Sequence, residues 1–111
     1  MLMAILVFNE SPAQLLTNNN VLISNSIQIT VKGTVQNNFG TVISNSGTID
    51  LTGNWVNNSG NNGFGISQGT VIMNGVNQSI QGTDQTVFNN LSLINGTKTI
   101  DLNTTVGGAN A

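Results

Sequence analysis

The chain has 111 residues, of which only 5% are charged, and two Lys or Arg against four Asp or Glu give a formal net charge of −2. A surface so poor in basic residues offers no binding site for phosphates, which argues against a nucleic-acid partner. His, Cys, Arg and Tyr are all absent from the sequence. This excludes Ser-His-Asp and Cys-His triads, thiolate or imidazole metal sites and Arg clamps, so we expect a protein that is not an enzyme and carries no cofactor or metal.

A short apolar run opens the chain, from Leu2 to Phe8, and small residues and the only Pro follow it. This order is typical of a secretory signal peptide, which would comprise residues 1–14 with cleavage near Ala13 or Gln14. No Lys or Arg precedes the run, so we expect the signal peptide to be truncated at its own start. The run is too short to span a bilayer, and we expect no membrane insertion once it is removed. The alternative is an N-terminal strand that caps the following domain.

A five-residue pattern recurs through the rest of the chain, residues 15–111, after a polar lead-in at Leu15–Asn20. Its four copies are Ile29-Thr30-Val31-Lys32-Gly33, Ile49-Asp50-Leu51-Thr52-Gly53, Val71-Ile72-Met73-Asn74-Gly75 and Leu91-Ser92-Leu93-Ile94-Asn95. Apolar residues at the first and third positions lie on one face of a strand, because strand side chains alternate. A period of 20–22 residues fits one coil of a solenoid, which buries its apolar side against neighbouring coils. We therefore predict an all-β protein, a right-handed parallel β-helix of about four coils, with a β-sandwich as the alternative.

The pattern also predicts the register in which the coils stack. Two inward-facing columns are expected, formed by Ile29, Ile49, Val71 and Leu91, and by Val31, Leu51, Met73 and Leu93. A further column contains Ile80 and Ile100, and its candidates in the earlier coils are Thr41–Ile43 and Phe64–Ile66. Gly or Asn at the end of each copy predicts a turn with positive φ, since Gly lacks a Cβ and Asn tolerates the left-handed region.

Asn residues recur at the same spacing as the apolar columns. Asn25 and Asn45 lie twenty residues apart in identical Ile-Ser-Asn-Ser segments, and Asn37 and Asn57 repeat in the same way. Asn side chains carry both donors and an acceptor, so they can bond to one another at equivalent positions of successive coils. We therefore expect Asn ladders. The alternative is that Asn is simply frequent in this composition.

Trp55 is the one candidate for a ligand contact, as a surface platform for carbohydrate stacking. Because it aligns with Val35, it is also a candidate core residue. Asp50 and Asp101 both follow Thr-Ile, but they fall on the outward side of different faces, so we do not expect the paired carboxylates of a glycosidase. Asp84 is expected to cap the backbone of its own turn. We expect the two Lys to point outward, where they hinder edge-to-edge pairing of strands.

Three consecutive motifs carry a resemblance to a known repeat. They are Gly69-Thr70-Val71-Ile72-Met73-Asn74-Gly75, Asn77-Gln78-Ser79-Ile80-Gln81-Gly82 and Val87-Phe88-Asn89-Asn90-Leu91-Ser92-Leu93. Over Gly69–Leu102, and more loosely over Val21–Gly53, the chain resembles the repetitive β-helix modules of large secreted bacterial surface proteins, which are adhesin-like and associated with type IX secretion. The resemblance implies secretion, display at the cell surface and adhesion. The C-terminal sorting domain that such proteins usually carry has no counterpart in this sequence.

The residues and the resemblance together predict a non-catalytic structural, adhesin-like repeat module that is secreted or displayed at the cell surface. Its expected partners are surface glycans, other cell-surface proteins and further copies of the chain that associate end to end. The alternatives are an ice-binding solenoid and a carbohydrate-binding or carbohydrate-active β-helix. Because no helix or charged strand follows Leu102 to cover the last coil, we also expect the chain to be a fragment of a longer one.

Overall fold

The computed structural model describes residues 14–19, 22–40, 42–60, 64, 68–101 and 104–107, and in these ranges the regular structure consists of strands. They are β1 (Gln14–Asn18), β2 (Leu22–Asn25), β3 (Gln28–Val31), β4 (Gly33–Asn37), β5 (Val42–Asn45), β6 (Thr48–Leu51), β7 (Trp55–Asn57), β8 (Thr70–Met73), β9 (Asn77–Gly82), β10 (Thr86–Phe88), β11 (Asn90–Leu93), β12 (Thr97–Ile100) and β13 (Thr104–Val106). Apart from Gln14, the expected signal peptide lies outside the described residues. β1 pairs with β4, so the expectation of a polar lead-in over Leu15–Asn20 is wrong, because most of this segment is a strand.

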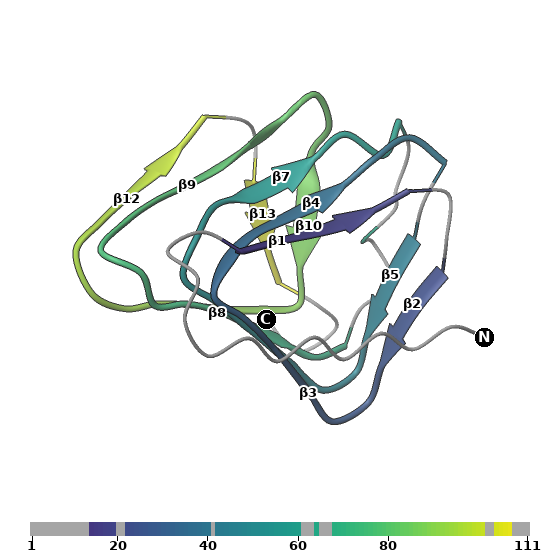
Figure 1. The fold of residues 1–111 in the computed structure, drawn as a ribbon, viewed down its shortest axis with the longest axis horizontal. Coiled ribbons are helices and arrows are strands. Elements are labelled where there is room, and N and C mark those ends of the chain that lie inside the picture. The colour runs from purple at the N-terminus through teal and green to yellow at the C-terminus, as the bar shows by residue number, and fades with distance from the viewer. Residues whose placement is uncertain are drawn as a thin grey trace.

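All the strand pairs within the described residues are parallel. They form a five-stranded sheet in the order β1-β4-β7-β9-β12, a four-stranded sheet in the order β11-β8-β6-β3, and the pairs β2-β5 and β10-β13. Each strand thus lies beside the equivalent strand of the next coil, and Figure 1 shows the chain winding repeatedly around one axis. This confirms the parallel β-helix of about four coils over the β-sandwich, whose strands would pair antiparallel.

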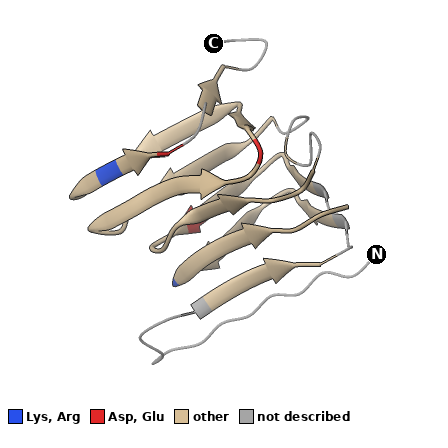
Figure 2. Ribbon diagram, turned by 90° about the horizontal axis from the view of Figure 1, so that it is seen from above, with Lys and Arg blue, Asp and Glu red and all other residues tan. Residues whose placement is uncertain are grey.

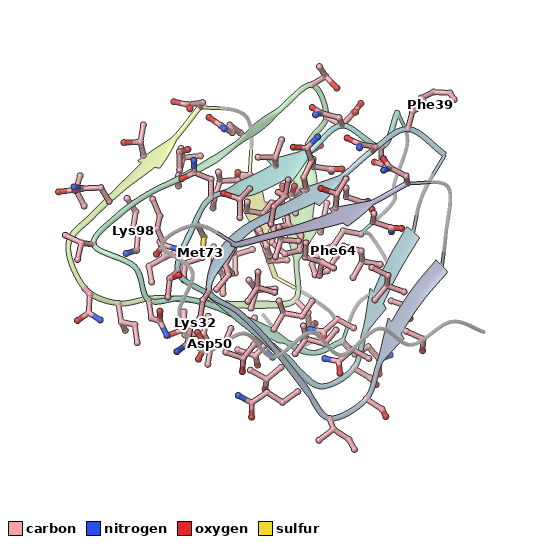
Figure 3. All side chains as sticks on the ribbon, viewed as in Figure 1. Lys32, Phe39, Asp50, Phe64, Met73 and Lys98 are labelled. Atoms are coloured by element: carbon pink, nitrogen blue, oxygen red, sulfur yellow. The ribbon has the colours of Figure 1, made fainter. Side chains whose placement is uncertain are left out.

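The two predicted apolar columns are confirmed in the four-stranded sheet. Its pairs give the columns Ile29–Ile49–Val71–Leu91 and Val31–Leu51–Met73–Leu93. The column residues of the two middle strands are at most 1% exposed, whereas Leu93 in the last strand is 41% exposed. A side chain in a solenoid is covered by the coils on both sides of it, so burial decreases at the end of the stack. Figure 3 shows Met73 inside the coil and Phe39 pointing away from it.

A third apolar column runs through the five-stranded sheet and differs from the expected one in the earlier coils. Its members are Leu16, Val35, Trp55, Ile80 and Ile100. Ile100 pairs with Ile80 as predicted. The earlier candidates are wrong, because Ile43 lies in β5 on another side of the coil and Phe64 lies in the connection between β7 and β8. Thr41 and residues 65–66, which completed those candidate segments, lie outside the described residues.

The glycines that end the first three repeats do not adopt left-handed φ, and two of them, Gly53 and Gly75, lie where the preceding coil packs closely against the backbone. Among the four turns, positive φ occurs only in the last, at Asn95 (63°) and Gly96 (56°). A Cβ on Gly53 would lie 2.3 Å from the carbonyl carbon of Gly33, and one on Gly75 would lie 2.0 Å from a carbonyl oxygen of the preceding coil. Stacked coils therefore approach too closely for a side chain there, and the prediction of positive φ is wrong for these three turns.

Candidate functional site

Trp55, the predicted candidate for carbohydrate stacking, lies in the middle of the core and has no exposed surface. Its ring packs edge to face against Phe64, with centroids 4.7 Å apart, and against Phe88, with centroids 5.3 Å apart. Its indole nitrogen donates a hydrogen bond to Thr86 Oγ1 at 3.1 Å. An indole covered on all sides presents no face to a sugar ring. The structure therefore supports the interpretation of Trp55 as a core residue and not the interpretation as a surface platform.

The carboxylates of the described residues are spread over separate parts of the solenoid (Figure 2). Asp50 projects outward from β6, where Oδ1 accepts a hydrogen bond from Asn74 Nδ2 at 2.6 Å, and burial raises its pKa above the ordinary value of 3.8. Asp84 Oδ2 accepts a hydrogen bond from the backbone nitrogen of Gly60, in the preceding coil, at 2.8 Å. Asp84 was expected to cap the backbone of its own turn, but this bond links two coils. Asp101 follows β12, in a different sheet from Asp50, as predicted, so the two do not form a catalytic pair.

Lys98 points into the coil and not outward as expected. It pairs with Gln78 of β9, whose side chain is 3% exposed and accepts a hydrogen bond from the backbone nitrogen of Gly75 at 2.7 Å. Lys98 occupies the position of Gln78 one coil later, and its Nζ contacts the turn between β11 and β12 in the same way. It donates to the carbonyl oxygens of Ile94 at 2.9 Å, of Asn95 and of Gly75. Figure 3 shows this side chain within the outline of the coil, where the ammonium group binds the chain's own backbone.

Of the predicted Asn ladders, the pair Asn25 and Asn45 is joined by a hydrogen bond, and a further bond that was not predicted joins Asn18 and Asn37. Asn25 Nδ2 donates to Asn45 Oδ1 at 2.8 Å, and Asn18 Nδ2 donates to Asn37 Oδ1 at 2.9 Å. Asn37 is also in register with Asn57, as predicted. All five carboxamides are buried, which a polar side chain tolerates only when it is hydrogen-bonded. These buried hydrogen bonds thus connect successive coils inside the solenoid, and a ligand does not reach them.

The outer side of the five-stranded sheet carries polar side chains, all neutral apart from Asp101, which follows β12 next to the inward Ile100, and we name this surface the polar face. Its neutral members are Thr17, Asn19, Thr34, Gln36, Asn38, Asn54, Asn58, Asn77, Ser79, Gln81, Thr97 and Thr99. They alternate along the strands with the inward residues of the third column. Leu15 and Val56 are apolar members of the same surface, and Leu15 is 54% exposed.

The polar face is fixed by hydrogen bonds between successive coils. Asn54 Oδ1 accepts from the backbone nitrogen of Ser79 at 2.9 Å, and Asn58 Oδ1 accepts from that of Thr83 at 2.9 Å. A shallow hollow of about 230 Å³ lies at one edge of the polar face. It is lined by Asn54, Asn77, Gln78, Ser79, Thr97 and Thr99. Hydroxyl and carboxamide groups that both donate and accept hydrogen bonds thus converge on one hollow without a charged group among them.

Sequence reasoning missed the polar face because the third column was assigned to the wrong segments in the early coils. A signal was nevertheless present in the residues next to that column. Val35 stands between Thr34 and Gln36, and Ile80 stands between Ser79 and Gln81. Polar residues on both sides of a buried aliphatic residue are typical of a strand with a polar outer side.

No protein-family model matches the chain, and no match was found among curated proteins or among solved structures. The described residues contain no helix long and apolar enough to cross a membrane. They also contain no group of three or more His, Cys, Asp or Glu that could hold a metal ion. The polar face and the sequence motifs are therefore the features of the chain that bear on its function.

Proposed function

We propose that the chain is a non-catalytic structural, adhesin-like module of a secreted or cell-surface protein, and that its polar face binds neutral glycans. The polar face is the observation that carries this proposal, because it offers hydroxyl and carboxamide groups over a whole sheet. Sugar hydroxyls both donate and accept hydrogen bonds, and these side chains do the same. A face without Lys or Arg favours an uncharged ligand over a phosphate or a sulfate.

A rigid scaffold supports this proposal. Neighbouring parallel strands lie about 4.8 Å apart, so equivalent side chains form regular rows along the solenoid axis. Asn54 and Asn58 are held by backbone donors of the next coil at 2.9 Å each. Groups that are already ordered lose little conformational entropy when a ligand binds, which favours weak polar binding of a long, repetitive ligand.

The hollow at the edge of the polar face is the proposed seat of one sugar unit. Thr97 and Thr99 are exposed there because the residue between them, Lys98, points into the coil. Asn77 and Ser79 stand opposite in the neighbouring strand. Two hydroxyl groups from Thr therefore face one carboxamide and one Ser hydroxyl, a set suited to the hydroxyls of a pyranose.

A glycan array probed with the labelled chain tests the proposal. We expect neutral glycans to be retained, and a Ser79→Lys/Thr99→Lys variant to bind them about tenfold more weakly, since one or two hydrogen bonds are lost. Thr30→Lys is the matched control, because Thr30 is exposed on the outer side of the four-stranded sheet. An array without bound neutral glycans, or equal losses in the variant and the control, would contradict the proposal.

Secretion and cell-surface location belong to the same proposal. They are supported by the apolar run Leu2–Phe8 and by the motif resemblance over Gly69–Leu102. Export of the chain from a bacterial host, followed by N-terminal sequencing of the secreted product, tests this part. An exported product that starts near Ala13 or Gln14 supports it, and a chain retained with its Met1 intact contradicts it.

The alternative functions have less support. An ice-binding face needs rows of one residue type, whereas the column Thr34, Asn54, Ser79 and Thr99 changes from coil to coil. A carbohydrate-active enzyme needs two carboxylates at one bond, whereas Asp50 and Asp101 lie in different sheets. Thermal hysteresis in a nanolitre osmometer and release of reducing sugars from neutral polysaccharides would favour the first and the second alternative, respectively.

A further inference from the structure

The turn between β11 and β12 contains the dipeptide Asn95-Gly96, and the equivalent turn one coil earlier contains Asn74-Gly75. In such a dipeptide the backbone nitrogen of Gly can attack the side-chain carbonyl of Asn, because Gly has no Cβ to hinder the approach. We propose that Asn95 is a site of spontaneous deamidation, that Lys98 promotes the reaction, and that Asn74 is protected by its contacts. This inference is independent of the proposed function.

The reaction consumes water and releases ammonia. Gly96 N loses its proton to water or hydroxide and attacks Cγ of Asn95. The new C–N bond closes a succinimide ring as the bond between Cγ and Nδ2 breaks, and Nδ2 takes up a proton from water and leaves as ammonia. Water then opens the ring at either carbonyl, which gives Asp or isoaspartate at position 95.

Asn95 is accessible for this reaction because its turn is exposed. Asn95 and Gly96 are both exposed, and they have left-handed φ values of 63° and 56°. Asn95 Nδ2 donates one hydrogen bond, to the carbonyl oxygen of Asn74 at 3.0 Å. The carboxamide therefore has to give up this one exposed bond in order to turn towards Gly96.

Lys98 acts on the peptide unit that supplies the nucleophile. Its Nζ donates to the carbonyl oxygen of Asn95, and that carbonyl and the Gly96 N–H belong to the same peptide unit. A cation bonded to the oxygen withdraws electron density from the unit, so it stabilises the anion that forms when the nitrogen loses its proton. Lys98 also donates to Ile94 at 2.9 Å, which holds the ammonium group in this position.

The dipeptide in the preceding coil is held in the opposite way. Asn74 Nδ2 donates to Asp50 Oδ1 at 2.6 Å, so a negative charge stands beside the carboxamide and opposes the charge of the attacking anion. Gly75 is buried, and its N–H donates to Gln78 Oε1 at 2.7 Å. Attack by Gly75 would break both hydrogen bonds and move a buried backbone, so the fold suppresses the reaction at Asn74.

The product changes the charge of the turn. Deamidation of Asn95 changes the formal net charge of the chain from −2 to −3 and places a carboxylate near the Lys98 ammonium group. Isoaspartate also lengthens the main chain at a turn whose backbone bonds to the preceding coil through Thr97 N and Val76 O at 2.7 Å. The turn of the last coil is therefore a site at which the chain is modified slowly by deamidation.

Peptide mass spectrometry of the folded chain, incubated at mildly alkaline pH, tests the inference. We expect deamidation at Asn95 to be faster than at Asn74, and Lys98→Gln to slow the reaction at Asn95 about fivefold, the difference between a charged and a neutral hydrogen bond. Gln is the residue that β9 carries at the equivalent position, so the coil accommodates it. Lys98→Arg keeps the charge and should keep most of the rate. When the chain is incubated unfolded in urea, the peptides that contain Asn74 and Asn95 should show equal rates of deamidation.

Each outcome decides one part of the inference. Deamidation at Asn74 that equals or exceeds that at Asn95 in the folded chain would overturn Asn95 as the site. A rate at Asn95 that Lys98→Gln leaves unchanged would overturn the role of Lys98. If Lys98→Gln does not fold, a loss of rate in Lys98→Arg decides against the charge, and a retained rate supports it. Asn62-Gly63, outside the described residues, is followed on a separate peptide.

Discussion

Trp55 pairs with Ile80 across β7 and β9, although 25 residues separate them along the chain. The other steps of the same column span 19 or 20 residues. Two of the additional residues lie in the connection between β7 and β8, and the other three lie in the turn between β8 and β9. Phe64, from the connection between β7 and β8, packs on Trp55 with ring centroids 4.7 Å apart. Phe88, from the following coil, completes the cluster at 5.3 Å from Trp55. The insertion between β7 and β8 is therefore fixed to the core through Phe64, one of three aromatic rings that pack together.

Loss of the central ring should be among the most damaging substitutions in the chain. Trp55→Ala removes the contacts to Phe64 and Phe88 and the hydrogen bond to Thr86, so we expect the free energy of unfolding to fall by about 3–5 kcal/mol. Urea denaturation followed by circular dichroism measures this loss. Val56→Ala, at the neighbouring outward position, is the control and should cost less than ~1 kcal/mol. Equal losses at the two positions would show that the aromatic cluster does not anchor the insertion.

The sequence predicted the four-stranded sheet because each copy of its pattern fills one strand without interruption. Ile49 and Val71 remain in register although two extra residues separate these copies, since the insertion falls in a connection. The third column was predicted only from Ile80 onward, because the extra residues before β8 and between β8 and β9 interrupt the period that identifies equivalent residues. Lys98 was predicted to point outward, yet its ammonium group lies at an inward position, where it donates to three carbonyl oxygens. A cation is rarely buried without such partners.

Asn45 joins three coils and should be energetically coupled to Asn25. It accepts a hydrogen bond from Asn25 Nδ2 at 2.8 Å and donates one to the carbonyl oxygen of Thr70 at 3.2 Å. Asn45→Ala leaves buried polar groups with fewer partners, so we expect a loss of about 1–3 kcal/mol in the free energy of unfolding. In a double-mutant cycle with Asn25→Ala, the double variant should lose less than the sum of the single variants. Strict additivity would contradict the ladder, and Ser24→Ala, at an exposed neighbour, controls for local effects.

Asp50 should make the stability of the chain depend on pH. Burial raises its pKa in the folded chain above 3.8, so the folded state binds the proton more tightly than the unfolded state does. The ionised carboxylate therefore lowers the free energy of unfolding. This loss is absent below pH 3.8, grows as the pH rises through the raised pKa of the folded chain, and is complete above that pKa. Asp50→Asn should therefore stabilise the chain at neutral pH, by less than ~1 kcal/mol because water screens a partly exposed carboxylate. Urea denaturation of both chains over a pH series measures the difference, which should vanish in acid; a constant difference would contradict the prediction.

Leu93 and Ile100 are the last residues of their columns, and 41% and 52% of their surfaces are exposed. Their neighbours in the preceding coil, Met73 and Ile80, are 0% and 3% exposed. β11 and β12 also lie at the ends of their sheets, and a free sheet edge is a template for another strand. We therefore expect copies of the chain to associate end to end through this surface.

Sedimentation velocity over a concentration series measures this association as an increase in the average sedimentation coefficient. Ile100→Lys places a charge where a second copy would stack, so the dissociation constant should rise about tenfold or more. Val76→Lys is the matched control, because Val76 is 69% exposed in a turn within the stack. If Ile100→Lys and Val76→Lys weaken association equally, the contact does not involve the last coil. A monomer at every concentration would instead show that strand edges and exposed aliphatic side chains at one end are not sufficient to join two solenoids.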